Sequence, residues 1–442
     1  MIQLSDHFDC KRLLRFTFPS IIMMVFTSIY GVVDGFFVSN YAGKTPFAAV
    51  NFIFPVLIIL GCPGFMLGTG GSALIAKTMG EGDKKRANQI FSLLIYVGAA
   101  AGVVLGAAGI ALLPSVAVLL GAEGRLLADC VTYGRIILLA GPFFMLQMEF
   151  QCLFATAEKP KLGLTVTVAA GVTNMVLDWL LVGVLRWGLV GAAAATAVSQ
   201  AVGGVIPLIY FARENSSLLR LTRCPFDGAV LLKTCANGSS ELMSNISMSV
   251  VSMLYNGQLM AKAGEDGVAA YGVLMYVSMV FQAIFIGYAV GTAPVVGYHH
   301  GAGNRGELKG LLRRSVLLIG GFSAAMCLAG ETLGRPLSVI FVGYDPDLLD
   351  MTAHAFAIFS VAFLFSGFAI FGSSFFTALN DGLTSALISF LRTLVFQCAA
   401  VIIFPILWGL DGIWWSIVAA EVMAVAVTLA FLTAKRKKYG YA

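Results

Sequence analysis

Five polar side chains stand out in the first half of this apolar chain because of their types and spacing. Asn174 and Asp178 are four residues apart, as are Thr196 and Gln200, so each pair would lie on one face of a helix. Asp34 lies in a third apolar stretch. A carboxyl group held away from water can exchange a neutral, protonated form for an anion that attracts a cation. These residues therefore predict reversible binding of a proton or a cation, with the amide and hydroxyl groups as polar support.

The composition places these residues in a membrane. Of 442 residues, 59% are hydrophobic and only 12% are charged, which is too little charge for the surface of a soluble protein. Apolar stretches of about 20 residues, enough to cross ~30 Å of hydrocarbon, recur along the chain. We expect an all-α integral membrane protein with twelve transmembrane helices, at residues 13–38, 48–75, 88–112, 131–155, 162–184, 189–211, 232–258, 268–297, 309–331, 352–376, 383–408 and 411–434.

The chain also repeats itself at an offset of 221 residues, half its length. The residues that recur are glycines and one threonine: Gly43/Gly264, Gly70/Gly291, Gly80/Gly301, Gly82/Gly303, Thr156/Thr377, Gly188/Gly409 and Gly191/Gly412. Duplication of an apolar unit is typical of secondary transporters, whose site lies between two related halves. Because six spans per unit preserve the direction of the repeat, we predict two parallel six-helix lobes, residues 1–221 and 222–442, related by an axis along the membrane normal.

The acids do not recur with the glycines. At the same offset Asp34 pairs with Tyr255 and Asp178 pairs with Ala399, so carboxylate chemistry is predicted in the first lobe alone. Both aspartates fall in the outer half of their spans, at similar depth, as does Thr196. The alternative is that each aspartate lies at the membrane surface or holds neighbouring helices together.

Other polar groups could contact a substrate or gate its path. These candidates are Glu149, Gln151, Glu241, Tyr255 and Asn256. For Glu149 and Glu241 the alternative is a structural role, and Arg392 with Glu421 favours a structural ion pair between neighbouring helices. Pro19 removes a backbone hydrogen bond from the first span and so predicts a bend there.

Basic residues predict the orientation. With both termini in the cytoplasm, most of the 28 Lys and Arg residues fall on the cytoplasmic side of a cell membrane. Only six fall on the other side: Lys44, Arg125, Arg135, Arg186, Lys262 and Arg335. The net charge of +5 follows from this bias, so we expect no nucleic-acid partner. The eight cysteines are scattered and predict free thiols, and neither a metal site nor a cofactor is expected.

Several segments resemble the multidrug and toxic compound extrusion (MATE) family of cation antiporters. Pro19 followed by VVDGFFVSNYAG is similar to the family's proline-bent first helix with its essential aspartate, here Asp34. TNMVLDWLLV resembles the fifth-helix motif that contains Asn174 and Asp178, and GLVGAAAATAVSQ resembles the sixth helix with Thr196. GYAVGTAPVVGYHHGAGNRG resembles the end of the eighth helix and the loop that follows it. One loop departs from the family, since residues 155–160 read ATAEKP where members commonly read RAxGxP.

The resemblance implies a monomer that exports small cationic amphipathic compounds in exchange for inward H⁺ or Na⁺. In that scheme Asp34 and Asp178 form one acidic site, which the coupling ion and the cargo occupy in turn while the lobes rock. Two rival functions remain. A flippase for lipids or lipid-linked glycans shares the superfamily but usually has several basic residues in its cleft, where only Arg392 is expected here. A membrane enzyme or scaffold is the other rival, although no HExxH, GxSxG or Walker motif occurs.

Overall fold

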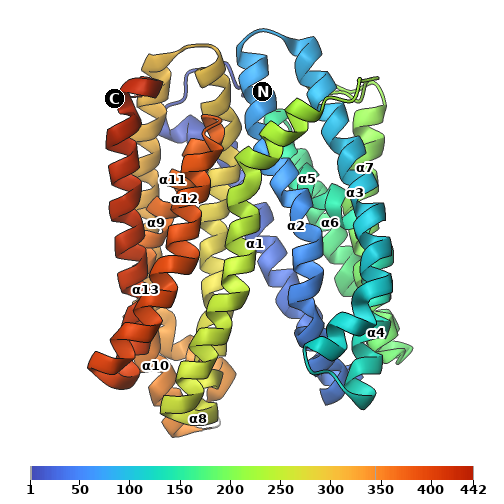
Figure 1. Cartoon of the computed structure of the whole chain (residues 1–442), viewed down its shortest axis with the longest axis vertical. Helices are drawn as coiled ribbons and strands as arrows, with labels where there is room; N and C mark the ends of the chain where they lie inside the picture. Colours follow the sequence, from blue (N-terminus) through green and yellow to red (C-terminus); the bar gives the residue numbers. More distant parts are fainter. Residues whose placement is uncertain (1, 344, 442) are drawn as a thin grey trace.

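The computed structural model describes residues 2–343 and 345–441, and in these residues all regular structure is helical (Figure 1). The α-helices are α1 Cys10–Phe37, α2 Lys44–Gly80, α3 Lys84–Leu119, α4 Gly124–Leu139, α5 Gly141–Thr156, α6 Pro160–Leu177, α7 Gly188–Ala212, α8 Gly228–Gly301, α9 Arg305–Val342, α10 Pro346–Ser360, α11 Phe363–Ala378, α12 Gly382–Phe390 and α13 Phe396–Tyr439. Three π-helical turns extend them: η1 Val38–Ala42, η2 Asp178–Val184 and η3 Leu391–Val395.

These helices provide the twelve predicted spans. Eight continuous helices in the described residues are long and apolar enough to cross a membrane, and two bent pairs, α4/α5 and α10/α11, bring the number to ten. Two of the continuous helices contain a glycine with a left-handed backbone, Gly264 (φ 64°) in α8 and Gly409 (φ 60°) in α13. Because the helical path breaks at these glycines, each of the two supplies a pair of spans, which gives twelve.

Two of the spans are not the single straight helices that the sequence predicted. The predicted span 131–155 consists of α4 and α5, which meet at an angle of 60°. The predicted span 352–376 consists of α10 and α11, which meet at 49°. The two breaks occupy equivalent places in the repeat, so the bend belongs to the duplicated unit.

The repeated glycines have identifiable structural reasons. Gly43, Gly82 and Gly188 all have positive φ values, of 106°, 90° and 57°, and their partners in the second half do as well. Each lies where one helix gives way to the next, and only glycine adopts this backbone without strain. The turns between spans therefore explain why these glycines recur although most other residues have changed.

The helices form two groups (Figure 1). We call α1–α7 the first lobe and α8–α13 the second lobe; Figure 1 shows them side by side, with both chain termini at the same end. We call this end the terminal face and the opposite end the far face. The two-lobe, twelve-helix architecture predicted from the sequence is confirmed, whereas the exact division at residue 221 stays a prediction.

Buried apolar side chains join the lobes near the terminal face. The largest buried cluster draws on both lobes and contains Phe91 and Phe150 of the first and Phe285 and Phe375 of the second. At the far end the core instead divides into two clusters, one within each lobe. The lobes therefore share a core at one end of the molecule only.

Glycines allow α2 and α8 to meet backbone to backbone within this shared region. A Cβ atom on Gly70 would lie 2.1 Å from the carbonyl oxygen of Thr234, and one on Gly238 would lie 2.0 Å from that of Met66. Gly80 is equally close to Tyr298 nearer the terminal face, at 2.0 Å. Small residues at helix contacts permit such approaches in membranes, and larger ones would hold the lobes apart.

The first helix shows where the contact between the lobes ends. Between residues 13 and 24, α1 contains eight buried residues, and its Thr17 packs against Gly291 of α8. Between residues 25 and 37 none is buried. The same helix is therefore covered in its terminal half and uncovered in its far half, so the lobes are closed at the terminal face and diverge toward the far face.

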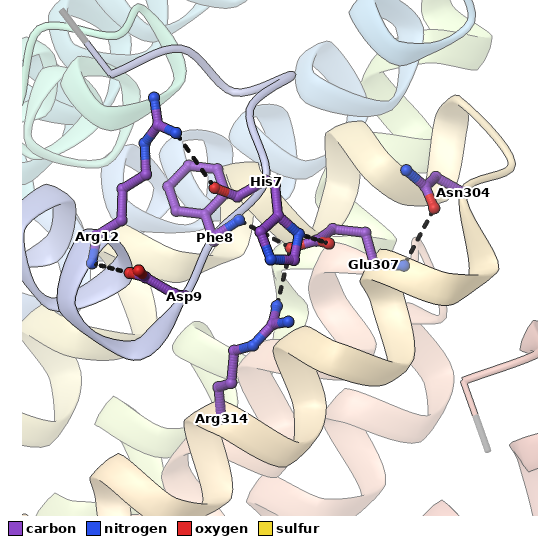
Figure 2. Close-up of polar contacts among 7 residues, drawn as sticks. All are labelled: His7, Phe8, Asp9, Arg12, Asn304, Glu307 and Arg314. Carbon is purple, nitrogen blue, oxygen red and sulfur yellow. Dashed lines mark hydrogen bonds and ion pairs between the residues drawn. The ribbon is translucent and has the colours of Figure 1, made fainter.

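The N-terminal segment, residues 2–9, reinforces this closure (Figure 2). The backbone N–H of Leu4 donates to Oε1 of Glu158 in the first lobe at 2.6 Å. Glu307 of the second lobe accepts from the N–H of Phe8 at 2.9 Å and pairs with Nδ1 of His7 at 2.6 Å. Glu307 also accepts from Arg314 of its own helix at 2.9 Å. The segment thus connects acids of the two lobes across the terminal face.

Glu158 lies in the loop that departs from the family's usual sequence. Its φ of 58° is a left-handed value, and it occupies the place where the family loop has glycine. Burial raises the pKa of this carboxyl, although the hydrogen bond from Leu4 acts in the opposite direction. In this chain the residue that replaces the glycine has a contact of its own, because it holds the N-terminal segment.

Candidate cation- and proton-binding site

The two aspartates predicted to bind a proton or cation come together in the first lobe. Asp34 lies in the far half of α1, and Asp178 is the first residue of the π-helical turn η2. Their carboxyl groups are near enough to interact electrostatically. Asp178 is fully buried, whereas Asp34 is half-buried. The pair therefore combines one sheltered carboxyl with one that is partly accessible.

Neither carboxyl has its hydrogen-bonding capacity filled by the protein. Both oxygens of Asp178 and Oδ1 of Asp34 are buried without a hydrogen-bond partner among the described residues. A charged group within a membrane protein needs a partner, and a proton or a bound cation could provide one. Since two neighbouring carboxylates repel each other, the first proton or cation to arrive is favoured. The arrangement is suited to one exchangeable positive charge.

Two of the three predicted supporting residues, Asn174 and Thr196, lie beside this pair. Asn174 and Thr196 lie close to Asp34, and Nδ2 of Asn174 donates to Oγ1 of Thr196 at 3.5 Å. Asn174 and Gln200 are buried, and each keeps a side-chain oxygen without a partner. The amide of Asn174, which lies beside Asp34, provides a dipole that can orient the carboxyl groups or share a bound ion.

The structure adds two tyrosines to this neighbourhood. Tyr133 of α4 is 3% exposed and lies within electrostatic range of both aspartates. Tyr30 of α1 lies near Asp34 and Gln147. The sequence analysis did not single out Tyr133. Its position near the start of the fourth span, at the height of Asp34, was the available signal.

A π-helical turn begins at Asp178 itself. The turn η2 covers Asp178–Val184, and another, η1, follows four residues after Asp34. Such turns are rare and occur frequently at functional sites, since they shift backbone groups out of the regular ladder. Pro19 lies in the same helix as Asp34 and removes a backbone hydrogen bond, yet α1 is continuous from Cys10 to Phe37.

The further candidates lie apart from the two aspartates. Glu149 is fully buried inside the first lobe, where its carboxyl lies against Gly98 of α3. Gln151 is also buried, two residues further along α5. Glu241 of α8 is half-buried and lies near Cys62 and Cys152, hence at the boundary between the lobes.

The second lobe has a polar cluster of a different kind. Tyr255 is buried, and its hydroxyl donates to Oε1 of Gln397 at 2.8 Å and lies 3.1 Å from Oγ of Ser416. Asn256 beside it is half-buried. At the place equivalent to Asp34 the second lobe therefore has a neutral group that is already satisfied by its neighbours.

Arg392 and Glu421 form the ion pair that the sequence favoured. Nε and Nη2 of Arg392 approach both oxygens of Glu421 at 2.8–3.1 Å, and the two side chains are 14% and 5% exposed. Each charge is satisfied by the other, so this pair differs from the two unpartnered aspartates.

A family model matches the chain over residues 19–180 and again over residues 241–402, together well over half its length. The chain belongs to the MatE family. The two matched segments fall one in each half, in agreement with the internal duplication read from the sequence.

Individual relatives of this MatE-family chain are distant but cover nearly all of it. The multidrug export protein MepA of Staphylococcus aureus (strain MSSA476) is 23% identical over 412 residues, 93% of this chain and 90% of the relative. MepA of Staphylococcus saprophyticus is 24% identical, covering 95% and 92%. A solved structure described as an outward-facing conformation of a multidrug resistance MATE family transporter has a TM-score of 0.93 and 22% identity, covering 99% and 98%. The fold expected from the resemblance is thereby confirmed.

Proposed function

We propose that this protein is a secondary active antiporter that exports small cationic amphipathic compounds in exchange for inward H⁺ or Na⁺. The observation that carries the proposal is the pair Asp34 and Asp178, two interacting carboxyl groups with unpartnered oxygens inside the membrane region. Membership of the MatE family and relatives named as multidrug export proteins support it.

Exchange follows from competition for one site. With the site ionised, a cationic cargo or Na⁺ is attracted; with it protonated, that attraction is lost and the cargo leaves. Asn174, Thr196 and Gln200 orient the carboxyl groups in both states. Exchange is obligatory if the two loaded forms favour different arrangements of the lobes.

The proposed cycle moves the lobe of residues 1–221 against that of residues 222–442. We place the terminal face in the cytoplasm, and the excess of basic residues on that side supports this orientation. With that orientation the conformation described above is closed to the cytoplasm, and its uncovered half of α1, which contains Asp34, lies on the outer side. Rocking would separate Gly70 from Thr234 and bring the lobes together at the far face. We propose a monomer, as the family resemblance implies.

The test uses purified protein in liposomes with a fluorescent lipophilic cation. Transport is followed under an imposed pH gradient and, separately, under a Na⁺ gradient, which also identifies the coupling ion. Asp34→Asn and Asp178→Asn should abolish gradient-driven transport while the protein still inserts. Glu265→Gln, a change at an exposed acid of the far face, is the matched control and should transport normally. Full transport by Asp34→Asn would overturn the proposal.

A lipid or lipid-linked glycan flippase is the alternative within the superfamily. A pyrophosphate group requires free positive charge, but Arg392 is already bound to Glu421 by three hydrogen bonds. The same liposomes can be assayed for movement of a labelled lipid across the bilayer. Lipid movement without transport of the cation would favour the flippase.

A further inference from the structure

Glu149 is a buried acid that the exchange scheme does not use. It lies on α5 and is 0% exposed, and both of its carboxyl oxygens lack a hydrogen-bond partner among the described residues. A Cβ atom on Gly98 of α3 would lie 1.7 Å from Oε1 and 2.5 Å from Cδ. The carboxyl therefore occupies the space above Gly98, which exists because residue 98 has no side chain.

No Lys, Arg or His among the described residues donates a hydrogen bond to Glu149. On the side of α2, Gly68 packs against its Cα atom, at 3.0 Å from a Cβ position, and against Cys152 of the next turn. A second acid lies nearby, since Glu241 of α8 and Glu149 are both within electrostatic range of Cys152. An ionised Glu149 would thus be an unpaired negative charge in an apolar setting, which is strongly unfavourable. A bound proton removes that charge.

Glu421 shows how this chain accommodates a buried acid that has a cationic partner. It is buried, and Arg392 contacts both of its oxygens. Glu149 has no such partner, so the two buried glutamates are predicted to differ in protonation although both lie within helical lobes.

Glu149 is also linked to the contact between the lobes. Helix α2 lies between α5 and α8: its Gly64 and Gly68 pack on Met145 and Glu149, and its Gly70 packs on Thr234. When α8 moves away from α2 at the terminal face, α2 remains packed on α5 but no longer has α8 packed on its opposite side. Water would then reach α5 most readily in the opened state.

We propose that Glu149 is a second proton-binding site, separate from Asp34 and Asp178, which holds a proton in the present conformation and releases it when the lobes part at the terminal face. The inference rests on the proposed antiport by rocking lobes. Glu149 would then carry one proton per cycle in addition to those carried by the aspartate pair.

The first experiment labels the unmodified protein with dicyclohexylcarbodiimide, which reacts with protonated carboxyl groups in apolar surroundings, and locates the adducts by mass spectrometry. At neutral pH Glu149 should be labelled and Glu421 should not, with Glu149→Gln removing that adduct alone. An unlabelled Glu149 in protein whose Asp178 is labelled would overturn the proposal. The comparison of Glu149 with Glu421 uses the unmodified protein, so it does not depend on whether a variant folds.

The second experiment measures protons moved per fluorescent cation exported, with a pH-sensitive dye inside the liposomes. Glu149→Gln should still transport but should move fewer protons per cation, whereas Glu265→Gln should leave the ratio unchanged. A labelled Glu149 with an unchanged ratio would show a permanently protonated structural residue and overturn the release step. Transport that survives Asp34→Asn would instead refute the proposed antiport, so the two failures are distinguishable.

Discussion

Gly70→Ala tests whether backbone contact between α2 and α8 determines which face of the protein is closed. The added methyl group would lie 2.1 Å from the carbonyl oxygen of Thr234 and 2.7 Å from the backbone nitrogen of Gly238. Ordinary contacts of a Cβ atom begin at 3.4 Å. Since the opposing atoms belong to a helix backbone, no side-chain rotation can relieve the clash, and the helices themselves must separate.

The expected size follows from the cost of overpacking. Extra methyl groups in a tightly packed contact cost about 1–3 kcal/mol, and this cost falls only on the state in which α2 and α8 touch. At about 1.4 kcal/mol for each factor of ten, the equilibrium should shift roughly 5- to 150-fold toward opening at the terminal face. The upper part of that range is expected because both partners are backbone.

The shift can be measured by pulsed electron paramagnetic resonance on cysteine-free protein with spin labels at Lys85 and Lys309, both exposed at the terminal face. Gly70→Ala should lengthen the distance between the labels. Gly31→Ala is the matched control, because a Cβ atom there meets nothing within 4 Å in the present conformation. If the two variants gave the same distances as the parent protein, the contact would not govern closure and the reasoning would be refuted.

Three further predictions concern charged groups. Glu307→Ala removes the acceptor that binds the N-terminal segment. It should therefore destabilise the closed state by about 1.5–3 kcal/mol, the usual contribution of a hydrogen bond to a charged group. Unchanged distances between the spin labels would contradict this. Glu421→Gln should lower the free energy of unfolding by about 3–5 kcal/mol because it leaves the buried charge of Arg392 without a partner. Replacing both residues by leucine should recover most of that loss, as measured by thermal unfolding. A double variant that loses as much stability as Glu421→Gln would argue against the pair. Burial alone would raise the pKa of Asp381, but its hydrogen bonds, chiefly from Lys435, bring it below the ordinary value of 3.8. The ionised Asp381 therefore contributes its full stabilisation above pH ~4, and this stabilisation is lost as pH falls through the lowered pKa. Asp381→Asn should destabilise the protein at pH 7 and progressively less in acid. A loss of stability that is the same at every pH would contradict this.

Much of the architecture could be predicted because membranes impose simple rules. Apolar stretches of fixed length identified the twelve spans, and the glycines at the 221-residue offset identified the duplication. Arg392 and Glu421 could be paired from their depths on neighbouring helices, since an unpaired charge there is too costly to be common. Depth within the spans also grouped the two aspartates, Asp34 and Asp178, with Asn174 and Thr196.

The direction of a side chain around its helix was harder to predict. Glu149 and Glu241 both occupy the terminal half of their helices, yet Glu149 lies against Gly98 within the first lobe and Glu241 lies between the lobes. Helical spacing relates residues on one helix to each other, but it does not say which neighbour a face meets. The 60° bend between α4 and α5 also changes which neighbours the side chains of α5 meet, because it reorients every residue after Ala140.

The sequence by itself determined the medium, the twelve crossings, the duplication and the confinement of the aspartates to the first lobe, since all of these depend on composition and on spacing along one chain. Only the tertiary structure decided that the lobes are closed at the terminal face, that Glu307 holds the N-terminal segment, and that Tyr133 joins the two aspartates. Those features depend on contacts between residues far apart in the chain. Contacts of that kind are set by how closely whole helices pack, which no single helix encodes.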